Sequence, residues 1–187
     1  MSPRVYLAGP DVFFADPELW VQTKKTICDL HGIVGVSPLD ELPDEPAQWS
    51  TFPFWRKIAH RNEAHIRSCQ ALIANLTPFR GPSADVGTVY EVGFARALGL
   101  KVFGYATTTE PFLARTLKGA AAQMQPDGSW RDGEGLLVEQ FGLSDNLMIE
   151  GAIIGSGGAL ITGDADRWTD LTLFERCVAA AAKVLVA

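Results

Sequence analysis

The fold class is decided by residues 71–105, ALIANLTPFRGPSADVGTVYEVGFARALGLKVFGY. This stretch opens with an apolar run at residues 71–76, which is typical of a buried strand, and closes with a second β-rich run at residues 101–105. Between the two runs, residues 85–98 predict a helix that Gly99 ends. Because parallel strands need a crossover connection, the order strand, helix, strand indicates part of a parallel sheet covered by helices.

The residues before this stretch show the same alternation. Residues 4–8 and 33–36 predict two more strands, and between them Asp16, which precedes a proline, has the properties of a helix N-cap. Residues 55–69 repeat apolar side chains with the 3.6-residue period of a helix. The apolar stripe of that helix contains one polar residue, Asn62.

The residues after the stretch are less regular. Residues 107–142 predict an irregular excursion in which residues 135–141 could form a short strand, and regular structure resumes with a helix start at residues 144–148 and a closing helix from about Thr169. We therefore expect an α/β fold, doubly wound in a flavodoxin-like or Rossmann-like manner, with a parallel sheet of about five strands and helices on both faces. The chain is expected to form a single domain, residues 1–187.

Composition and charge exclude several classes of protein. A hydrophobic fraction of 47% and a charged fraction of 20% exclude a disordered or fibrous chain. With 16 Lys and Arg against 22 Asp and Glu, the net charge of -6 does not suit a nucleic acid polymer as partner. No apolar run reaches the ~18 residues of a membrane span, and no secretory signal is visible. The three cysteines form no paired motif, so we expect a cytoplasmic protein without a membrane partner.

Ligands of open α/β sheets bind where strands end and the following helices begin. The loop after the third predicted strand is the most informative, because Asp85 and Glu91 flank Gly87 and Thr88 at a predicted helix start. Gly87 would let a ligand approach the backbone, and the free N–H groups of the first helical turn can hold an anion or a hydroxyl group. On spacing alone, an N-cap at Asp85 and a solvated helix residue at Glu91 explain the same pattern.

Three motifs occur together and in order: YLAGPDVF at residues 6–13, D-x-G-T-x-x-E-x-G at residues 85–93 and F-G-x-S-D-N-L-M at residues 141–148. On these motifs the chain resembles the nucleoside 2-deoxyribosyltransferase family over nearly its whole length. The resemblance implies transfer of a 2'-deoxyribosyl group from a deoxynucleoside to a free nucleobase through a covalent glycosyl-glutamate intermediate, with hydrolysis as a side reaction. It implies no metal and no organic cofactor.

The resemblance also assigns roles to single residues. Glu91 matches the nucleophile, Tyr6 matches the phenol that orients it by a hydrogen bond, and Asp85 matches the residue that binds sugar hydroxyls. Asn146 and Met148 match a segment that a neighbouring subunit contributes to the sugar site, which implies a homo-oligomer. From the residues alone, Tyr6 is equally typical of a half-buried strand tyrosine, and Asn146 with Met148 is typical of a capped helix with a core methionine.

Residues after the first strand are candidates for binding the base. Gly9 begins this loop, and Phe13, with Phe14 as the alternative, offers a ring on which a base can stack. Asp11 suits a contact with an exocyclic amine or a proton transfer, and Asp40 lies in the loop after the second strand. Both aspartates are also residue types that turns favour.

Gln70 is a departure from the family pattern. The family commonly has an aspartate at the start of the third strand, where it protonates the departing base, and an amide cannot transfer a proton at ordinary pH. General acid catalysis typically contributes about 10²–10⁴-fold. We therefore expect an altered base range or low transferase activity unless Asp11, Asp40 or a water chain replaces the acid.

Two other functions fit the same residues. A nucleotide N-glycosidase would need a phosphate site, for which Arg80 and Arg96 are candidates, and a nucleotide-sensing module would need no turnover, which Gln70 favours. His60 and His65 have no metal-ligand partner at helical spacing, so we expect both histidines at the surface and no metal site.

Overall fold

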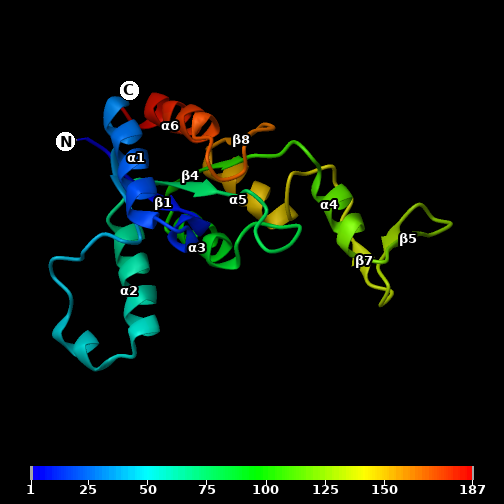
Figure 1. The fold of residues 1–187 in the computed structure, drawn as a ribbon, viewed down its shortest axis with the longest axis horizontal. Helices are drawn as coiled ribbons and strands as arrows, with labels where there is room; N and C mark the ends of the chain where they lie inside the picture. Colours follow the sequence, from blue (N-terminus) through cyan, green and yellow to red (C-terminus); the bar gives the residue numbers. More distant parts are fainter. Residues whose placement is uncertain (1, 187) are drawn as a thin grey trace.

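A five-stranded parallel sheet organises the computed structural model, which describes residues 2–186 (Figure 1). Its strands are β1 (Arg4–Ala8), β2 (Val34–Val36), β3 (Ala71–Asn75), β4 (Lys101–Ala106) and β8 (Leu160–Thr162). They lie in the order β2-β1-β3-β4-β8, with every neighbouring pair parallel. This is the flavodoxin-like strand order. β2 is added on one side of β1, and β3 and the later strands are added on the other side, so the order of addition reverses between β1 and β3.

Helices cover both faces of this sheet, which confirms the doubly wound architecture. One face packs against α1 (Pro17–Leu30) and α6 (Thr172–Leu185), and the other against α2 (Phe54–Arg67), α3 (Val86–Ala97) and α5 (Leu147–Ser156). Strand residues alternate between the two cores: Val5 and Leu7 belong to the α1 and α6 side, whereas Tyr6 and Ala8 belong to the side of α2, α3 and α5. The alternation directs the Tyr6 side chain toward α3.

The predicted starts of three helices are confirmed, and so is the end that Gly99 predicts for α3. Each helix has a side-chain N-cap, in which Asp16, Asp85 and Asn146 accept hydrogen bonds from the backbone N–H groups of Leu19, Thr88 and Met148. Each is followed by a glycine with positive φ, namely Gly32, Gly99 and Gly157. These local signals fix where the loops at the carboxyl edge of the sheet enter α1 and α3.

The region after β4 contains more regular structure than the sequence predicts. It holds a helix, α4 (Phe112–Gly119), and a small antiparallel sheet of β5 (Gln123–Met124), β6 (Trp130–Arg131) and β7 (Leu137–Val138). Together these elements extend away from the body of the molecule (Figure 1). β7 lies within residues 135–141, where a short strand was expected. The two-residue strands β5 and β6 are too short to show a period in sequence, and β8 was not predicted. The last helix begins at Thr172, whose N–H is bonded to Asp170, and not near Thr169.

Two further segments shape the carboxyl edge of the sheet. A short 3-10 helix, η1 (Pro10–Phe13), follows β1, and the proline-rich loop after β2 contains a second one, η2 (Ala47–Thr51), which hangs below the body beside α2 (Figure 1). His60 of α2 stacks with Trp49 at a ring distance of 5.2 Å, which fixes this loop against the helix.

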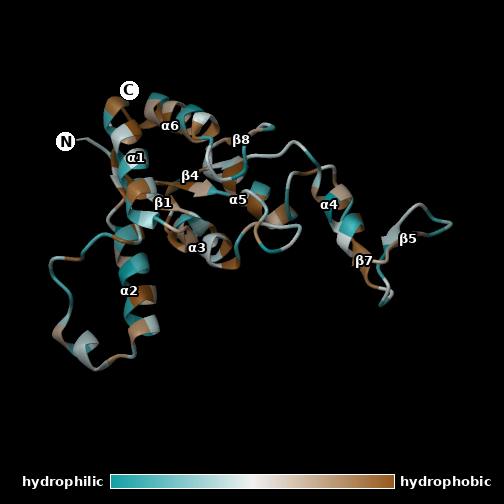
Figure 2. Cartoon of the chain, in the orientation of Figure 1, coloured by the Kyte–Doolittle hydropathy of each residue, from teal (hydrophilic) through white to brown (hydrophobic). Residues whose placement is uncertain are grey.

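The hydropathy of the residues follows these layers. Figure 2 shows hydrophobic colour along β1 and β4, whereas the helices alternate between hydrophilic and hydrophobic residues, as amphipathic helices do. In residues 2–186, helices of the length and apolarity needed to cross a membrane are absent.

Candidate active site

A cavity of about 510 Å³ opens at the carboxyl edge of the sheet, where β1, β2 and the start of α3 meet α2. Its volume is in the range of small-molecule sites. It also lies outside the carboxyl ends of the strands, near the point between β1 and β3 where the strand order reverses, which is where open α/β sheets bind ligands. Lining residues are Gly9, Val12, Phe13, Pro38, Leu39, Asp40, Phe54, Ile58, Arg61, Asn62, Asp85, Gly87, Thr88 and Glu91.

Glu91 lies on the second turn of α3 with its carboxyl group at the bottom of this cavity. Its side chain is buried, and its Oε1 accepts hydrogen bonds from the Tyr6 hydroxyl at 2.7 Å and from Asn62 Nδ2 at 3.2 Å. Among the hydrogen bonds between described residues, none reaches Oε2. One carboxylate oxygen is therefore held in place by the protein while the other is free to meet a ligand.

The surroundings of Glu91 change its acidity. Burial raises the pKa of Glu91 to about 7; the Tyr6 hydrogen bond lowers it, the charge of Asp85 raises it, and the Asn62 hydrogen bond lowers it. Burial also raises the pKa of Tyr6 well above 10. Tyr6 therefore keeps its proton and donates a hydrogen bond to Glu91. Near neutral pH the carboxyl group is thus present in both its neutral and its ionised form.

Asp85 is the N-cap of α3 and also lines the cavity, so the N-cap interpretation is confirmed, while its role in binding sugar hydroxyls stays a prediction. Its Oδ2 accepts hydrogen bonds from the N–H of Thr88 at 2.9 Å and the hydroxyl of Thr88 at 3.1 Å. A Cβ at Gly87 would lie 3.1 Å from the same Oδ2, tighter than ordinary contact, so a glycine leaves room for this conformation. The second oxygen of Asp85 remains for a ligand.

Asn62 is a site residue that the sequence analysis did not identify. Its Nδ2 donates to Glu91, while its Oδ1 is buried and, within residues 2–186, has no hydrogen-bond partner. Buried polar atoms are nearly always satisfied, so this oxygen suits a donor group of a bound molecule. The signal was present in the sequence, because Asn62 is the one polar residue in an apolar helical stripe.

The wall opposite α3 is formed by the loops after β1 and β2. Phe13 lies in the cavity lining with 56% of its surface exposed, and its ring stacks on Phe79 at 5.5 Å. Phe14 instead packs edge-on against Trp168. Gly9 is required here, because a Cβ would come within 2.8 Å of the Asn75 Cβ.

Asp11 and Gln70 do not line the cavity, which contradicts their assignment to the base. Asp11 is buried and forms an ion pair with Lys24, and its other oxygen accepts a hydrogen bond from Asn75 at 3.1 Å. Gln70 is exposed and its Oε1 accepts a hydrogen bond from the Arg4 N–H at 2.7 Å. Because Gln70 precedes β3, it lies at the amino edge of the parallel sheet, opposite the cavity.

Asn146 and Met148 lie outside the cavity of their own chain. Asn146 caps α5 and donates a hydrogen bond to Glu139 at 2.6 Å. Met148 is 71% exposed and lines a separate groove of about 470 Å³ between α3 and α5, so it is not a core methionine. That these residues complete a neighbouring subunit's site stays a prediction.

The histidines of α2 are not both at the surface. His65 is buried with its Nε2 3.1 Å from the Asp40 carbonyl oxygen, and His60 is partly covered by Trp49. The prediction of surface histidines was wrong, because both face the loop after β2 and hold it. In the part of the chain that the structure describes, no three His, Cys, Asp or Glu side chains are grouped as metal ligands.

Comparisons with known proteins identify the family of the chain. A family model described as nucleoside 2-deoxyribosyltransferase matches residues 5–148, a range that contains Tyr6, Asp85 and Glu91. An uncharacterized protein of Schizosaccharomyces pombe is 34% identical over 169 residues, which cover 83% of this chain and 79% of the relative.

Solved structures are similar over almost the whole chain. A 2-deoxyribosyltransferase from Leishmania mexicana is 28% identical with a TM-score of 0.63, and the match covers 97% of both chains. A CMP N-glycosidase from Clostridium botulinum has a TM-score of 0.50 over 97% of this chain and 98% of its own. At 13% identity, the second likeness concerns the fold alone.

Proposed function

The chain belongs to the nucleoside 2-deoxyribosyltransferase family, and from this premise we propose that it transfers a 2'-deoxyribosyl group between nucleobases through a covalent intermediate on Glu91. One observation carries the proposal: a buried carboxylate, held through one oxygen by Tyr6, has its other oxygen free in a cavity of nucleoside size. Hydrolysis of the intermediate by water is the expected side reaction.

The first step forms an ester. Glu91 Oε2 attacks the anomeric carbon, the bond from that carbon to the base nitrogen breaks, and its electron pair leaves with the base, which takes up a proton. In the second step, a nitrogen of the acceptor base attacks the same carbon and gives up its proton to water, while the bond from that carbon to Oε2 breaks and its electron pair returns to the carboxylate. Two inversions restore the original configuration, as in retaining glycosidases.

Tyr6 and Asn62 would act on this step by holding Oε1. Their hydrogen bonds favour the ionised form of Glu91, which is the nucleophile, and they fix the direction in which Oε2 points. The free Oδ1 of Asn62 would accept a hydrogen bond from the substrate, but an amide cannot supply the proton that the departing base needs. Bases that leave readily with a proton from water are therefore the expected substrates.

The sugar end would be bound by Asp85 and by a second copy of the chain. Asp85 has one oxygen not used by the Thr88 cap, and carboxylates bind hydroxyl groups well. The groove between α3 and α5 is largely apolar and includes exposed Met148, so it suits a self-complementary contact around a two-fold axis. In such a homo-oligomer, Asn146 and Met148 would complete the neighbour's site.

The charges of the cavity favour a nucleoside over a nucleotide. Among the described lining residues, Asp40 is paired with Lys25 and the one cation, Arg61, is paired with Glu45, which leaves the carboxyl groups of Asp85 and Glu91 to face a ligand. A phosphate dianion would meet like charge there, whereas a nucleoside is neutral. Comparing turnover of deoxyadenosine with that of its 5'-monophosphate therefore separates a transferase from a nucleotide N-glycosidase.

Base exchange in solution tests the proposed function. The protein is incubated with single deoxynucleosides and free purine and pyrimidine bases, and the products are separated by chromatography. Glu91→Gln keeps the shape of the side chain but removes the nucleophile, and should lower exchange about a thousandfold or more. Without an acceptor, mass spectrometry should find one deoxyribosyl unit on the peptide that contains Glu91. Undiminished exchange in the variant would exclude Glu91 as nucleophile, and absence of both exchange and adduct would favour a sensing module.

A further inference from the structure

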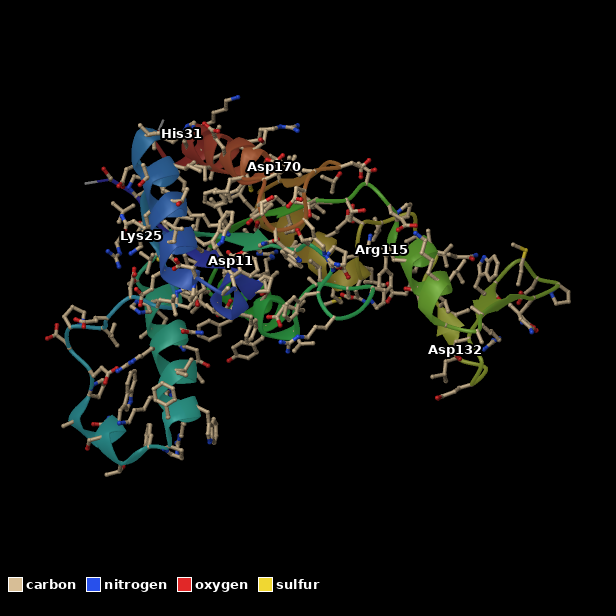
Figure 3. The ribbon with its side chains drawn as sticks, viewed as in Figure 1. Asp11, Lys25, His31, Arg115, Asp132 and Asp170 are labelled. Carbon is tan, nitrogen blue, oxygen red and sulfur yellow. The ribbon has the colours of Figure 1, made fainter. Side chains whose placement is uncertain are left out.

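Two consecutive lysines of α1 reach the two loops that form the wall of the cavity opposite α3. Lys24 pairs with Asp11 of η1, and Lys25 Nζ lies 2.5 Å from Asp40 Oδ1 in the loop after β2 (Figure 3 labels Asp11 and Lys25). These loops carry Val12, Phe13, Pro38 and Leu39 of the cavity lining. Neither lysine lines the cavity itself.

The Lys24 pair is buried in a network that joins five elements, α1, η1, β3, β4 and α6. Lys24 and Asp11 expose 3% and 7% of their surface, so water contributes little to their solvation. Lys24 Nζ also donates to the Tyr105 hydroxyl of β4 at 2.9 Å and lies 5.0 Å from the Phe174 ring centre on α6. Both oxygens of Asp11 are thus engaged, one by Lys24 and the other by Asn75 at the end of β3.

Bringing these charges into the interior costs a large part of what their attraction returns, so a buried pair adds little to stability compared with apolar residues of the same size. It does impose a geometry, because Asp11 must stay within hydrogen-bonding distance of two groups at once. The η1 helix has four residues and no side-chain cap, so Asp11 is its polar anchor among the described contacts. The position of Phe13, two residues later, follows from that anchor.

Lys25 holds the loop after β2 in a similar way, through an ion pair with Asp40 that is partly exposed to solvent. Asp40 Oδ2 accepts a hydrogen bond from the Ser37 N–H at 3.0 Å, which closes a short turn, and Lys25 binds the other oxygen. His65 contacts the carbonyl oxygen of Asp40 at 3.1 Å from the opposite side. Asp40 is therefore fixed as part of the wall.

We propose that Lys24 and Lys25 are positioning residues that set the base-side wall of the cavity, Lys24 through Asp11 and η1, and Lys25 through Asp40 and its turn. The effect on substrate rests on the proposed function. The bracing of the loops does not, and it is measured separately.

Hydrogen exchange of the full-length protein, followed by mass spectrometry, tests the bracing. In η1 the Phe14 N–H is bonded to the Asp11 carbonyl, and in the second loop the Asp40 N–H is bonded to the Ser37 carbonyl, so each loop has its own reporter amide. Lys24→Met should speed exchange about tenfold in residues 10–14 and leave residues 37–41 as they were. Lys25→Met, the matched control, should do the reverse.

A second variant keeps the test decisive if Lys24→Met does not fold. The double variant Lys24→Met, Asp11→Asn removes both buried charges, so it should fold, yet it lacks the link to α1 and should still exchange faster in residues 10–14. Lys24→Arg should restore slow exchange. Unchanged exchange in both loops, or an equal rise throughout the chain, would overturn the proposal.

Kinetics of base exchange test the consequence for substrate. Because the wall contacts the base in the ground state and the transition state alike, Lys24→Met should raise KM for the deoxynucleoside about tenfold and change kcat less than about threefold. A fall in kcat at unchanged KM would overturn the assignment to base binding. If the hydrogen-exchange results are as expected but the unmodified protein does not turn over deoxynucleosides, the bracing of the loops holds and the proposed function is wrong.

Discussion

The two oxygens of Glu91 have different surroundings, and this difference determines how the residue can act. Oε1 accepts hydrogen bonds from Tyr6 and Asn62, whereas Oε2 accepts none from the described residues, and Glu91 lines the cavity. A nucleophile needs this combination, because an oxygen with two hydrogen-bond donors has less electron density to give. Burial leaves the carboxyl group close to half ionised near pH 7.

Removing the Tyr6 hydroxyl should therefore change both rate and pH dependence. Tyr6→Phe keeps the buried ring but deletes a hydrogen bond to a charged group, so kcat should fall about ten- to a hundredfold. Since that bond lowers the pKa of Glu91, the acid limb of the pH-rate profile should move to higher pH. Tyr90→Phe, which removes an exposed hydroxyl of α3 bonded to Glu63 of α2, is the matched control. A profile that does not move would show that Tyr6 does not act on the ionisation of Glu91.

The raised pKa of Glu91 also predicts how stability varies with pH. In the folded chain this carboxyl group holds its proton up to about pH 7, whereas its unfolded value is 4.5. Between these values the folded state binds more protons than the unfolded state, so its contribution to stability is lost as pH rises. Glu91→Gln, which cannot ionise, should be more stable than the unmodified protein at pH 8, on the order of 3 kcal/mol, and should lose that advantage at pH 4. Thermal unfolding at the two pH values measures this, and an equal difference at both would contradict it.

At the scale of the element, α3 places the site through its first turn. Asp85 begins the helix, Gly87 gives access to its backbone, and Glu91 follows on the next turn with its carboxyl group in the same cavity. The cap residue Asp85 and the proposed nucleophile Glu91 thus lie on one rigid helix.

Variants of Asp85 separate these two roles. Asparagine caps helices as well as aspartate does, so Asp85→Asn should keep the melting temperature, whereas Asp85→Ala should cost about 1 kcal/mol. Both should raise KM for the deoxynucleoside. Because the charge of Asp85 raises the pKa of Glu91, Asp85→Asn should move the acid limb to lower pH, opposite to Tyr6→Phe. Calorimetry and the pH-rate profile check the two effects, and a rise in KM only in the alanine variant would assign Asp85 to capping alone.

The sequence predicted the elements whose signals are local. Cap residues predicted the starts of α1, α3 and α5, Gly99 predicted the end of α3, and apolar runs predicted the first four strands of the main sheet. The short strands β5 and β8 were not predicted, because two or three residues carry no period. β2 is as short as β8, and its prediction rested on the apolar run at residues 33–36.

The site was predicted less completely, for a reason of topology. Residues that follow a parallel strand and residues that precede it lie at opposite edges of the sheet, so Gln70 was assigned to an edge it does not reach. Asn62 lies 29 positions from Glu91 in sequence and meets it only because α2 packs on α3. Contacts of this kind between helices cannot be derived from spacing along the chain.

At the scale of the whole molecule, two parts of the surface carry several exposed apolar residues. Met148 lines the groove between α3 and α5, and the segment of α4 and β5 to β7 extends from the body with Leu136, Leu137 and Phe141 exposed (Figure 1). Arg115 anchors this segment, with hydrogen bonds to backbone carbonyls on both sides of it (Figure 3). A two-fold contact between copies would cover the groove and bring Asn146 of one chain toward the cavity of the other.

Mixing two inactive variants tests whether sites are shared between chains. If Asn146 acts in the neighbour's site, Glu91→Ala and Asn146→Ala homo-oligomers each lack a group at every site, but a mixed pair has one site with both groups intact. When equal amounts of the two variants are dissociated and reassembled, half of the pairs are mixed and each has one intact site of two, so activity should return to about a quarter of the unmodified level. Light scattering verifies that assembly has occurred. Recovered assembly without recovered activity would mean that each chain builds its site alone, and Asn146 would then be only the cap of α5.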